Sequence, residues 1–263
     1  MALIGAQMYT LRDYCKTPAD IARSCERVKA MGYDGIQASS AGFATFDLKE
    51  VKQIRKALDD NGLVCAATHE GLRDADDDRI KTIIEKHRIL DCKLTAIGGF
   101  FPKDEWTVAL WQNFIKDYNA IAKKFAAGGL RIGYHNHSHE LAPLENGRTP
   151  LAMLLEKLDP SLWFEIDVYW IAHGLGDPAQ WIDKVAASGK GRIPAVHYKD
   201  GIVNSKREHK MMPIGTGNLN WPRINKACAA AGVEWYLVER DSGDHDPFDA
   251  LEISIKNMRA MGL

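Results

Sequence analysis

Short apolar segments alternate with longer segments of helical spacing along the whole chain, and this rhythm restricts the possible folds more than any other feature of the sequence. Within 263 residues, eight strands and eight helices in strict alternation are what a (β/α)₈ barrel requires. The expected strands are LIGAQM (3–8), DGIQA (34–38), LVCAAT (63–68), LTAIG (94–98), LRIGYH (130–135), WFEID (163–167), PAVHY (194–198) and WYLVE (235–239).

The segments between the expected strands have one apolar face and one charged face. In 18–31, Ile21, Cys25, Val28 and Met31 fall on a single stripe, as in an amphipathic helix. Acidic residues and prolines stand at several of the expected helix starts, where the first turn tolerates both. The remaining expected helices are 46–60, 76–90, 104–127, 149–158, 177–187, 220–232 and 246–262.

The main rival to a closed barrel is an open, doubly wound sheet. It is disfavoured because no glycine-rich turn follows the first strand, where nucleotide-binding sheets carry one. No linker, low-complexity tract or long run of charge divides the chain. We therefore predict an α/β fold, a (β/α)₈ TIM barrel, with a single domain over residues 1–263.

Composition narrows the partners and the compartment. A formal net charge of −1 gives no electrostatic reason to expect nucleic acid or an anionic membrane as a partner. No apolar run approaches the ~18 residues of a membrane span, and the N-terminal segment lacks the basic region of a signal peptide. The five cysteines are scattered without a CxxC pair, which favours a reducing compartment. These features predict a cytoplasmic protein.

Ionisable residues follow five of the expected strands. The active site of a TIM barrel is built at the carboxyl ends of its strands, so these side chains are expected to share one crevice. Buried carboxylates must be paired or coordinated, and a divalent cation would neutralise them; mixed oxygen and nitrogen ligands suit Mn²⁺, Mg²⁺, Co²⁺ or Zn²⁺. The residues are His69 and Glu70; His135, His137 and Glu140; Asp167; His197, Lys199 and Asp200; and Glu239, Arg240 and Asp241.

Several motifs carry a resemblance to a known family. They are GAQMYTLRD near the start, YHNHSHEL, FEIDVYWIAHGLGDP, VHYKD, PIGTGNLNW and the C-terminal YLVERDSGDHDPFDALEISIKNMRAMG. With these motifs the chain resembles the xylose isomerase-like TIM barrel superfamily, which groups sugar isomerases and epimerases with AP endonuclease family 2. The last motifs are typical of a bacterial branch of sugar phosphate isomerases/epimerases, some of whose relatives are dehydratases or eliminate from oxidised glycosides.

The resemblance implies a metal-ligand set taken from strands five to eight. Asp167, His197 and Glu239 match the family's ligands on strands six, seven and eight. On strand five the relatives have a glutamate at the strand end, where this chain has His135. We therefore expect Glu140 to supply the missing carboxylate, with His135 or His137 as the substitute ligand.

Other residues near the strand ends have two readings each. His69 is either a substrate contact or a structural hydrogen-bonding group, and Trp170 and His173 are expected to line a sugar pocket. Lys199 and Arg207 are expected to hold a hydroxyl, carboxylate or phosphate group of the substrate. The alternative is that they are solvent-exposed charges at the edge of the active-site opening. His87 and His209 are predicted to lie at the surface, and GTGN (215–218) is predicted to be a tight turn rather than a phosphate-binding loop.

Gln37 stands on the second strand where many relatives have a glutamate, so no role is carried over to it.

These residues suit proton abstraction next to a carbonyl. We expect a divalent-metal isomerase or epimerase that acts on a keto-sugar or sugar derivative through an enediolate, with Glu140 and Glu239 as the flanking carboxylates. A base from His135 or His137 would instead favour a lyase, acting on a 3-keto-glycoside or an inosose-type substrate. A third alternative is a non-catalytic sugar-binding or partner subunit.

The expected cofactor is one divalent ion, Mn²⁺ first, with Mg²⁺, Co²⁺ or Zn²⁺ as alternatives. The expected partner is a small sugar substrate, with no nucleic acid and no membrane, and a homodimer or homo-oligomer is the default assembly.

Overall fold

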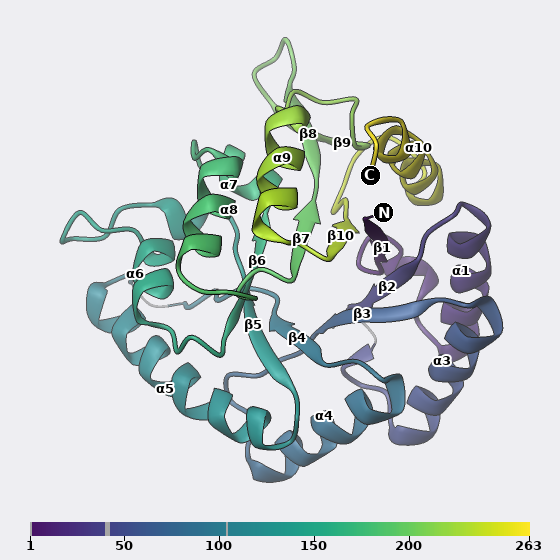
Figure 1. The fold of residues 1–263 in the computed structure, drawn as a ribbon, viewed down its shortest axis with the longest axis horizontal. Coiled ribbons are helices and arrows are strands. Elements are labelled where there is room, and N and C mark those ends of the chain that lie inside the picture. The colour runs from purple at the N-terminus through teal and green to yellow at the C-terminus, as the bar shows by residue number, and fades with distance from the viewer. Residues whose placement is uncertain (1, 40–42, 104) are drawn as a thin grey trace.

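The strands close into a barrel surrounded by helices (Figure 1). The computed structural model describes residues 2–39, 43–103 and 105–263, and in this part of the chain eight parallel strands follow the order β1-β10-β7-β6-β5-β4-β3-β2 around the barrel. The barrel strands are β1 (Leu3–Gln7), β2 (Gly35–Ala38), β3 (Val64–His69), β4 (Leu94–Ile97), β5 (Arg131–His135), β6 (Trp163–Asp167), β7 (Ala195–Tyr198) and β10 (Trp235–Val238). The predicted fold class and all eight predicted strands are confirmed.

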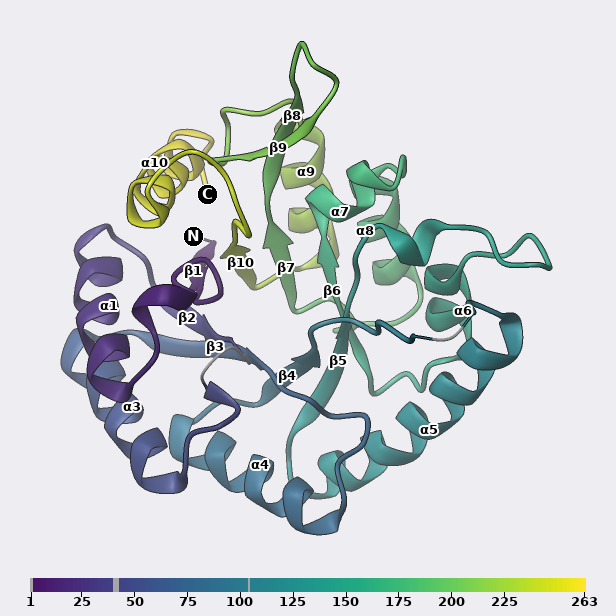
Figure 2. The ribbon, with the colours of Figure 1, turned by 180° about the vertical axis from the view of Figure 1, so that it is seen from behind.

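The predicted helices form the outer ring, seen from both ends of the barrel in Figures 1 and 2. No helix in the described residues is both long enough and apolar enough to cross a membrane. The helices of the ring are α1 (Pro18–Ala30), α3 (Leu48–Asn61), α4 (Asp77–Leu90), α5 (Val108–Ala127), α6 (Pro150–Lys157), α8 (Pro178–Ala187), α9 (Trp221–Ala231) and α10 (Pro247–Ala260).

Side-chain caps explain where these helices begin. Each helix of the ring follows a residue whose side-chain oxygen accepts a hydrogen bond from a backbone N–H of the first turn. At Thr17 and Asp47 the cap is reciprocal, because an acidic residue three positions later accepts from the backbone of the capping residue. Each such cap stabilises a helix by about 1 kcal/mol.

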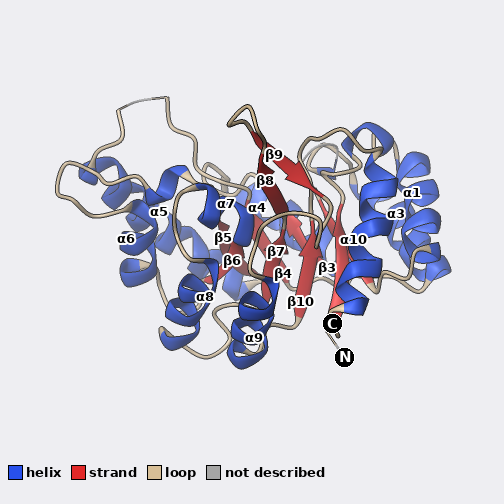
Figure 3. Cartoon of the chain, turned by 90° about the horizontal axis from the view of Figure 1, so that it is seen from above, coloured by secondary structure: helices blue, strands red, loops and turns tan. Residues whose placement is uncertain are grey.

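Some elements lie outside the predicted alternation. A short helix, α7 (Val168–His173), directly follows β6, and an antiparallel hairpin of β8 (Asp200–Val203) and β9 (His209–Met212) follows β7. Two single turns of 3-10 helix, η1 (Arg12–Tyr14) and η2 (His139–Leu141), follow β1 and β5. Figure 3 shows the hairpin standing at the opposite end of the barrel from the two termini.

The interior of the barrel changes character along the strands. Where the strands begin, Trp163, Trp235 and Leu237 fill the space between four buried alanines of the neighbouring strands. The backbone of Gly133 leaves room for the indole of Trp163, since a Cβ at this position would lie 2.5 Å from that ring. Where the strands end, the buried interior side chains are polar. The apolar layer thus closes one end of the barrel, and the ionisable groups gather at the other.

The prediction that His87 lies at the surface is wrong. Its side chain is 2% exposed on the inner face of α4, where Nδ1 lies 2.7 Å from the carbonyl oxygen of Ile83 and Nε2 lies 2.7 Å from the hydroxyl of Thr68. His209, on β9, is exposed as predicted. The sequence around His87 does not reveal the hydroxyl of Thr68, the partner from β3 that allows this histidine to be buried.

Candidate active site

Four ionisable side chains converge at the carboxyl ends of neighbouring strands. His135 ends β5, Asp167 ends β6, His197 lies on β7 and Glu239 follows β10. All four are buried, and one ligand atom from each lies within 4.8 Å of those from the other three. The structure therefore brings together the three residues expected as ligands on strands six, seven and eight, and His135 joins them from strand five.

The atoms of this cluster fit a bound cation. Nδ1 of His197 lies 2.9 Å from Oε2 of Glu239 and 3.8 Å from Oδ2 of Asp167, and both carboxylate oxygens also face the ammonium group of Lys199. Ligand atoms about 2.1 Å from one ion lie at most about 4.2 Å apart, so small side-chain movements would place all four groups on a shared ion. Two imidazole and two carboxylate ligands suit a divalent transition metal.

Asp167 fulfils two roles with its two oxygens. Oδ1 accepts a hydrogen bond from the backbone N–H of Trp170 at 2.9 Å and so caps α7. Oδ2 faces the cluster, 3.2 Å from Nζ of Lys199. The same carboxylate can therefore cap α7 with one oxygen and face a cation with the other.

Lys199 lies inside the cluster rather than at its rim. Its Nζ is 2.8 Å from Oε2 of Glu239, 3.2 Å from Oδ2 of Asp167 and 3.0 Å from Oδ2 of Asp241, and the side chain is buried. Burial opposes the charged form, but the three carboxylates outweigh it and raise the pKa of Lys199. The ammonium group therefore remains charged and neutralises part of the acidic cluster.

Charges and burial act in opposite directions on the other groups. Burial would raise the pKa of Glu239, but Lys199 and His197 outweigh this and lower it well below its usual range. Burial raises the pKa of Asp167 to about 6, although Lys199 and His197 oppose the change. Burial and the charge of Lys199 lower the pKa of His137 to about 3. The cluster thus holds an ionised Glu239 close to a neutral histidine.

A second polar layer lies deeper in the barrel, around Glu165. Its Oε1 accepts a hydrogen bond from Nε2 of Gln37 at 2.7 Å, and its Oε2 lies 2.5 Å from Nε2 of His69. Gln37 also contacts Gln7, whose Nε2 donates to Oε1 of Gln37 at 3.0 Å. Sequence reasoning missed Glu165, although it stands two residues before Asp167 and strand periodicity places both on the inner face.

Glu140 lies outside the cluster, contrary to its expected role as the strand-five ligand. Its Oε1 accepts a hydrogen bond from the hydroxyl of Tyr134 at 2.7 Å, and its Oε2 accepts one from the backbone N–H of His137 at 2.8 Å. Both oxygens are therefore used to hold the loop after β5, and Glu140 belongs to neither potential metal-binding group of the described residues. His135, the substitute considered from the sequence, occupies the strand-five position.

A cavity of about 270 Å³ opens onto the cluster. His69, His135, His137, Lys199, Glu239 and Asp241 provide its polar lining, and Tyr9 and Phe101 provide aromatic surface. Its volume is below the ~300–1,000 Å³ of typical ligand pockets, which suits a molecule of monosaccharide size. The cavity can therefore bring a small polar ligand into contact with the cluster.

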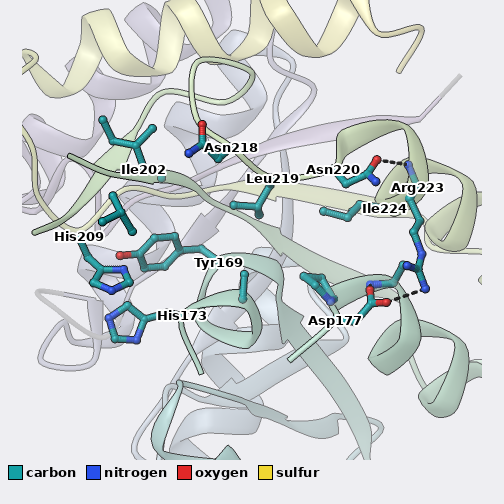
Figure 4. Close-up of a pocket in the computed structure, with 15 residues that line it drawn as sticks. Tyr169, His173, Asp177, Ile202, His209, Asn218, Leu219, Asn220, Arg223 and Ile224 are labelled. Atoms are coloured by element: carbon teal, nitrogen blue, oxygen red, sulfur yellow. Dashed lines mark hydrogen bonds and ion pairs between the residues drawn. The ribbon is translucent and has the colours of Figure 1, made fainter. Parts of the chain in front are cut away.

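The remaining predicted contact residues are spread over three places. Trp170 lies beside the cavity, with its ring centre 5.3 Å from that of His137 and 5.4 Å from Nζ of Lys199. His173 instead lines a separate cavity of about 390 Å³ together with Tyr169 and His209 (Figure 4). Arg207 is exposed in the turn between β8 and β9 and is not part of the cavity lining. Of these three residues, the structure brings only Trp170 close to the cluster.

The GTGN segment forms a turn whose amides are already occupied. The backbone N–H groups of Gly215 and Gly217 donate to Oδ2 of Asp200 at 2.8 and 3.0 Å, and Nε1 of Trp221 donates to the same oxygen at 2.9 Å. The buried carboxylate of Asp200 thus takes the place that a phosphate would need. The predicted tight turn is confirmed.

A closed barrel with ionisable groups at the carboxyl ends of its strands defines this chain as a TIM-barrel protein with a candidate active site where that fold carries one. Residues 25–261 match the family described as xylose isomerase-like TIM barrel, and the chain belongs to that family.

Solved structures show the same fold at low sequence identity. A sugar phosphate isomerase/epimerase from Parabacteroides distasonis is 23% identical with a TM-score of 0.80, covering 98% of this chain and 96% of that one. The probable 3-DHS dehydratase AsbF from Bacillus anthracis is 14% identical with a TM-score of 0.75, covering 98% and 99%. A xylose isomerase-like TIM barrel protein from Mycobacterium smegmatis, in complex with magnesium, is 13% identical with a TM-score of 0.72, covering 99% and 97%. No curated protein sequence matches the chain.

Proposed function

We propose that this protein is a divalent-metal-dependent isomerase or epimerase that acts on a keto-sugar or sugar derivative by abstracting a proton next to a carbonyl. The observation that carries the proposal is the convergence of His135, Asp167, His197 and Glu239, whose buried nitrogen and oxygen atoms face one another beside a small polar cavity. One ammonium group, that of Lys199, faces three carboxylates there, so a bound cation would neutralise the remaining negative charge.

The four converging side chains are the proposed metal ligands, and Mn²⁺ is the proposed ion. Two imidazoles and two carboxylates are a donor set that Mn²⁺, Co²⁺ and Zn²⁺ accept. When bound, a divalent ion would polarise a carbonyl oxygen and lower the free energy of the negative charge that proton abstraction creates. The magnesium in the Mycobacterium smegmatis relative supports a cation in this family.

The chain's own residues supply the proton carriers. Nδ1 of His137 is buried without a hydrogen-bond partner, and the low pKa of His137 keeps the ring neutral, so that its unprotonated nitrogen can face the substrate. The hydrogen bond from the backbone N–H of His137 to Glu140 fixes the loop that carries this ring. Lys199 is the charged donor next to Glu239, suited to hold an oxygen of the substrate. Proton transfer by such positioned groups contributes about 10²–10⁴-fold to a rate.

A metal-dependent lyase is the second candidate. Glu140 is engaged with Tyr134 and the loop, so Glu239 has no carboxylate partner from strand five, and histidines take that side of the cluster. One histidine base, together with the ammonium of Lys199 as a hydrogen-bond donor to the leaving oxygen, would suit removal of a proton followed by loss of a hydroxyl or glycosidic oxygen. The dehydratase among the structural relatives supports this reading.

Glu239→Gln tests the proposed function. We expect Mn²⁺-reconstituted wild-type protein to retain about one ion per chain and to exchange the hydrogen next to the carbonyl of a keto-sugar for solvent deuterium. The substitution should reduce both bound metal and exchange by more than about 100-fold, because it removes a charged ligand. Mass spectrometry separates the candidates, since isomerisation and epimerisation keep all atoms whereas elimination releases water or an alcohol.

Glu234→Gln, an exposed position just before the same strand, is the matched control and should behave as the wild type. Unchanged metal content and exchange in Glu239→Gln would end the assignment of the site. Wild-type protein that binds no ion after reconstitution would instead support a non-catalytic subunit.

A further inference from the structure

The carboxylate of Glu165 connects the inner ring nitrogens of three histidines. The side chain is fully buried and does not line the cavity. Its Oε2 lies 2.5 Å from Nε2 of His69, 3.2 Å from Nε2 of His197 and 3.6 Å from Nδ1 of His135. An ionised carboxylate can only accept hydrogen bonds, so the nitrogens that bond to it must carry protons.

This contact decides which nitrogen of His197 remains free. Nε2 of His197 also lies 2.6 Å from Oε1 of Gln37, an amide oxygen that only accepts, so the proton resides on Nε2. The opposite nitrogen, Nδ1, then faces Oε2 of Glu239 at 2.9 Å. Nδ1 of His135 points toward Glu165 but makes no hydrogen bond with it at 3.6 Å, and its Nε2 lies 3.9 Å from Oδ2 of Asp167. Both rings therefore reach from Glu165 to the carboxylates at the cavity.

The inner residues could themselves be a metal site, because one ligand atom each from His69, His135, Glu165 and His197 also lie within 4.8 Å of one another. Their hydrogen bonds argue against this alternative. Both oxygens of Glu165 already accept from nitrogen donors, and neither Glu165 nor His69 has an unpartnered buried atom. Nδ1 of His135 points into this inner group without a hydrogen bond, but it is a single atom, whereas Asp167, His197 and Glu239 direct one nitrogen and two carboxylate oxygens toward one another in the outer group. Because both oxygens of Glu165 are occupied, we place the cation in the outer group.

We propose that Glu165 is a positioning residue for the cation site, an inference that rests on the function proposed above. A carboxylate that accepts a hydrogen bond from the second nitrogen of a ligating imidazole fixes both its tautomer and its ring orientation. Glu165, together with Gln37, does this for His197: the two side chains hold a proton on Nε2 and direct Nδ1 toward Asp167 and Glu239, where Nδ1 exchanges its proton for the cation. Glu165 acts through the imidazoles and contacts neither the cation nor the substrate.

Glu165→Gln tests this role because it keeps the size of the side chain but replaces an accepting oxygen by a donating NH₂ group. The donors of Gln37, His69 and His197 can then no longer all be accepted, so the rings reorient. We expect the affinity for Mn²⁺, measured by calorimetric titration of chelator-treated protein, to fall about 10- to 100-fold. Equal affinity in the variant and the wild type would overturn the role of Glu165.

Glu70→Gln is the matched control. Glu70 is also buried, directly after β3, but its charged neighbours are Lys86 and Arg79 rather than the cluster. This variant should keep the wild-type affinity for Mn²⁺. A loss equal to that of Glu165→Gln would show that removal of any buried carboxylate is sufficient, and would overturn the inference.

Nitrogen NMR of the histidine rings gives a readout that a general loss of stability would not move. In metal-free wild-type protein we expect a proton on Nε2 of both His69 and His197, and in Glu165→Gln we expect both Nε2 signals to shift. A His197 ring protonated only at Nδ1 in the wild type would overturn the inference without any variant. Wild-type protein that takes up no Mn²⁺ would contradict the proposed function, and this inference with it, whereas equal Mn²⁺ binding by both proteins contradicts only the role of Glu165.

Discussion

His87 shows how burial changes the chemistry of a single side chain. Both ring nitrogens have a polar partner, the carbonyl of Ile83 and the hydroxyl of Thr68, so the neutral ring is fully satisfied inside the protein. Burial lowers the pKa of His87 from 6.5 to about 4. The unfolded chain therefore binds a proton in a pH range where the folded protein does not.

This difference predicts a loss of stability in acid. Above pH 6.5 the ring is neutral in both states, and as the pH falls from about 6.5 to about 4 only the unfolded state gains the proton. The free energy of unfolding should therefore fall by about 3 kcal/mol across this range and level off below it. Urea unfolding at several pH values measures the change. His87→Gln should be less stable but lack this component of the pH dependence, and an identical pH profile for both proteins would contradict the prediction.

Neighbouring ionisable residues at the end of β5 have different roles. His135 joins the ionisable cluster and His137 lines the cavity. Glu140 instead accepts hydrogen bonds from Tyr134 and from the backbone N–H of His137. The sequence showed that these residues were close together, but it did not show which acid or imidazole would face the cluster. Which side chain faces the cluster depends on the backbone conformation of the loop after β5, and the spacing of residues in the sequence does not reveal that conformation.

At the scale of elements, the loop of residues 213–219 is organised around one buried acid. Asp200, at the start of β8, is 1% exposed and accepts hydrogen bonds from the amides of Gly215 and Gly217 and from the indole of Trp221. Gly217 approaches so closely that a Cβ would lie 2.2 Å from Oδ1 of Asp200. The acid therefore ties the end of the hairpin to the start of α9.

Asp200→Asn should destabilise the protein by about 2–3 kcal/mol, because an NH₂ group would face donors that now bond to a charged oxygen. Urea unfolding gives the free energy, and hydrogen exchange should show faster exchange of the Gly215 and Gly217 amides. Asp244→Asn is the control, since the ion pair of Asp244 with Lys210 of the same hairpin is exposed to solvent and should contribute little to stability. Equal, small losses for both variants would argue against the anchoring role of Asp200.

The elements that the sequence did not predict are those without a repeating pattern. The helix α7 has six residues and the strands of the hairpin have four each, too short for a hydrophobic period to stand out. Their positions depend on contacts with the barrel, such as the cap that Asp167 provides for α7. The longer helices carried caps and amphipathic faces, and these were predicted.

At the scale of the whole molecule, the apolar end of the barrel depends on close contact between large and small residues. Trp163 packs against Gly133 on the neighbouring strand β5. Trp235 packs against Gly35 of β2, which is separated from β10 by β1. Such a pairing lets two tryptophans occupy the centre of the barrel, so that the opposite end can hold charged groups. The protein therefore needs both the large and the small side chains at these positions.

Gly133→Ala should lower the free energy of unfolding by about 1–3 kcal/mol, because the added methyl group overlaps the indole of Trp163. Thermal unfolding should show a decrease of a few degrees in Tm. In the double variant with Trp163→Phe the smaller ring should relieve the overlap, so the combined loss should be less than the sum of the single losses. Additive losses would contradict this account of the contact.

The sequence by itself determined the barrel, its strands and the chemical types gathered at the strand ends, because hydrophobic period and strand alternation are local properties of the chain. Only the tertiary structure decided which of these groups meet. It placed His135 rather than Glu140 beside Asp167, His197 and Glu239, and it placed Glu165 behind two of the imidazoles. The physical reason is that a buried side chain takes the partner that satisfies its hydrogen bonds, and that partner comes from strands far away in the sequence.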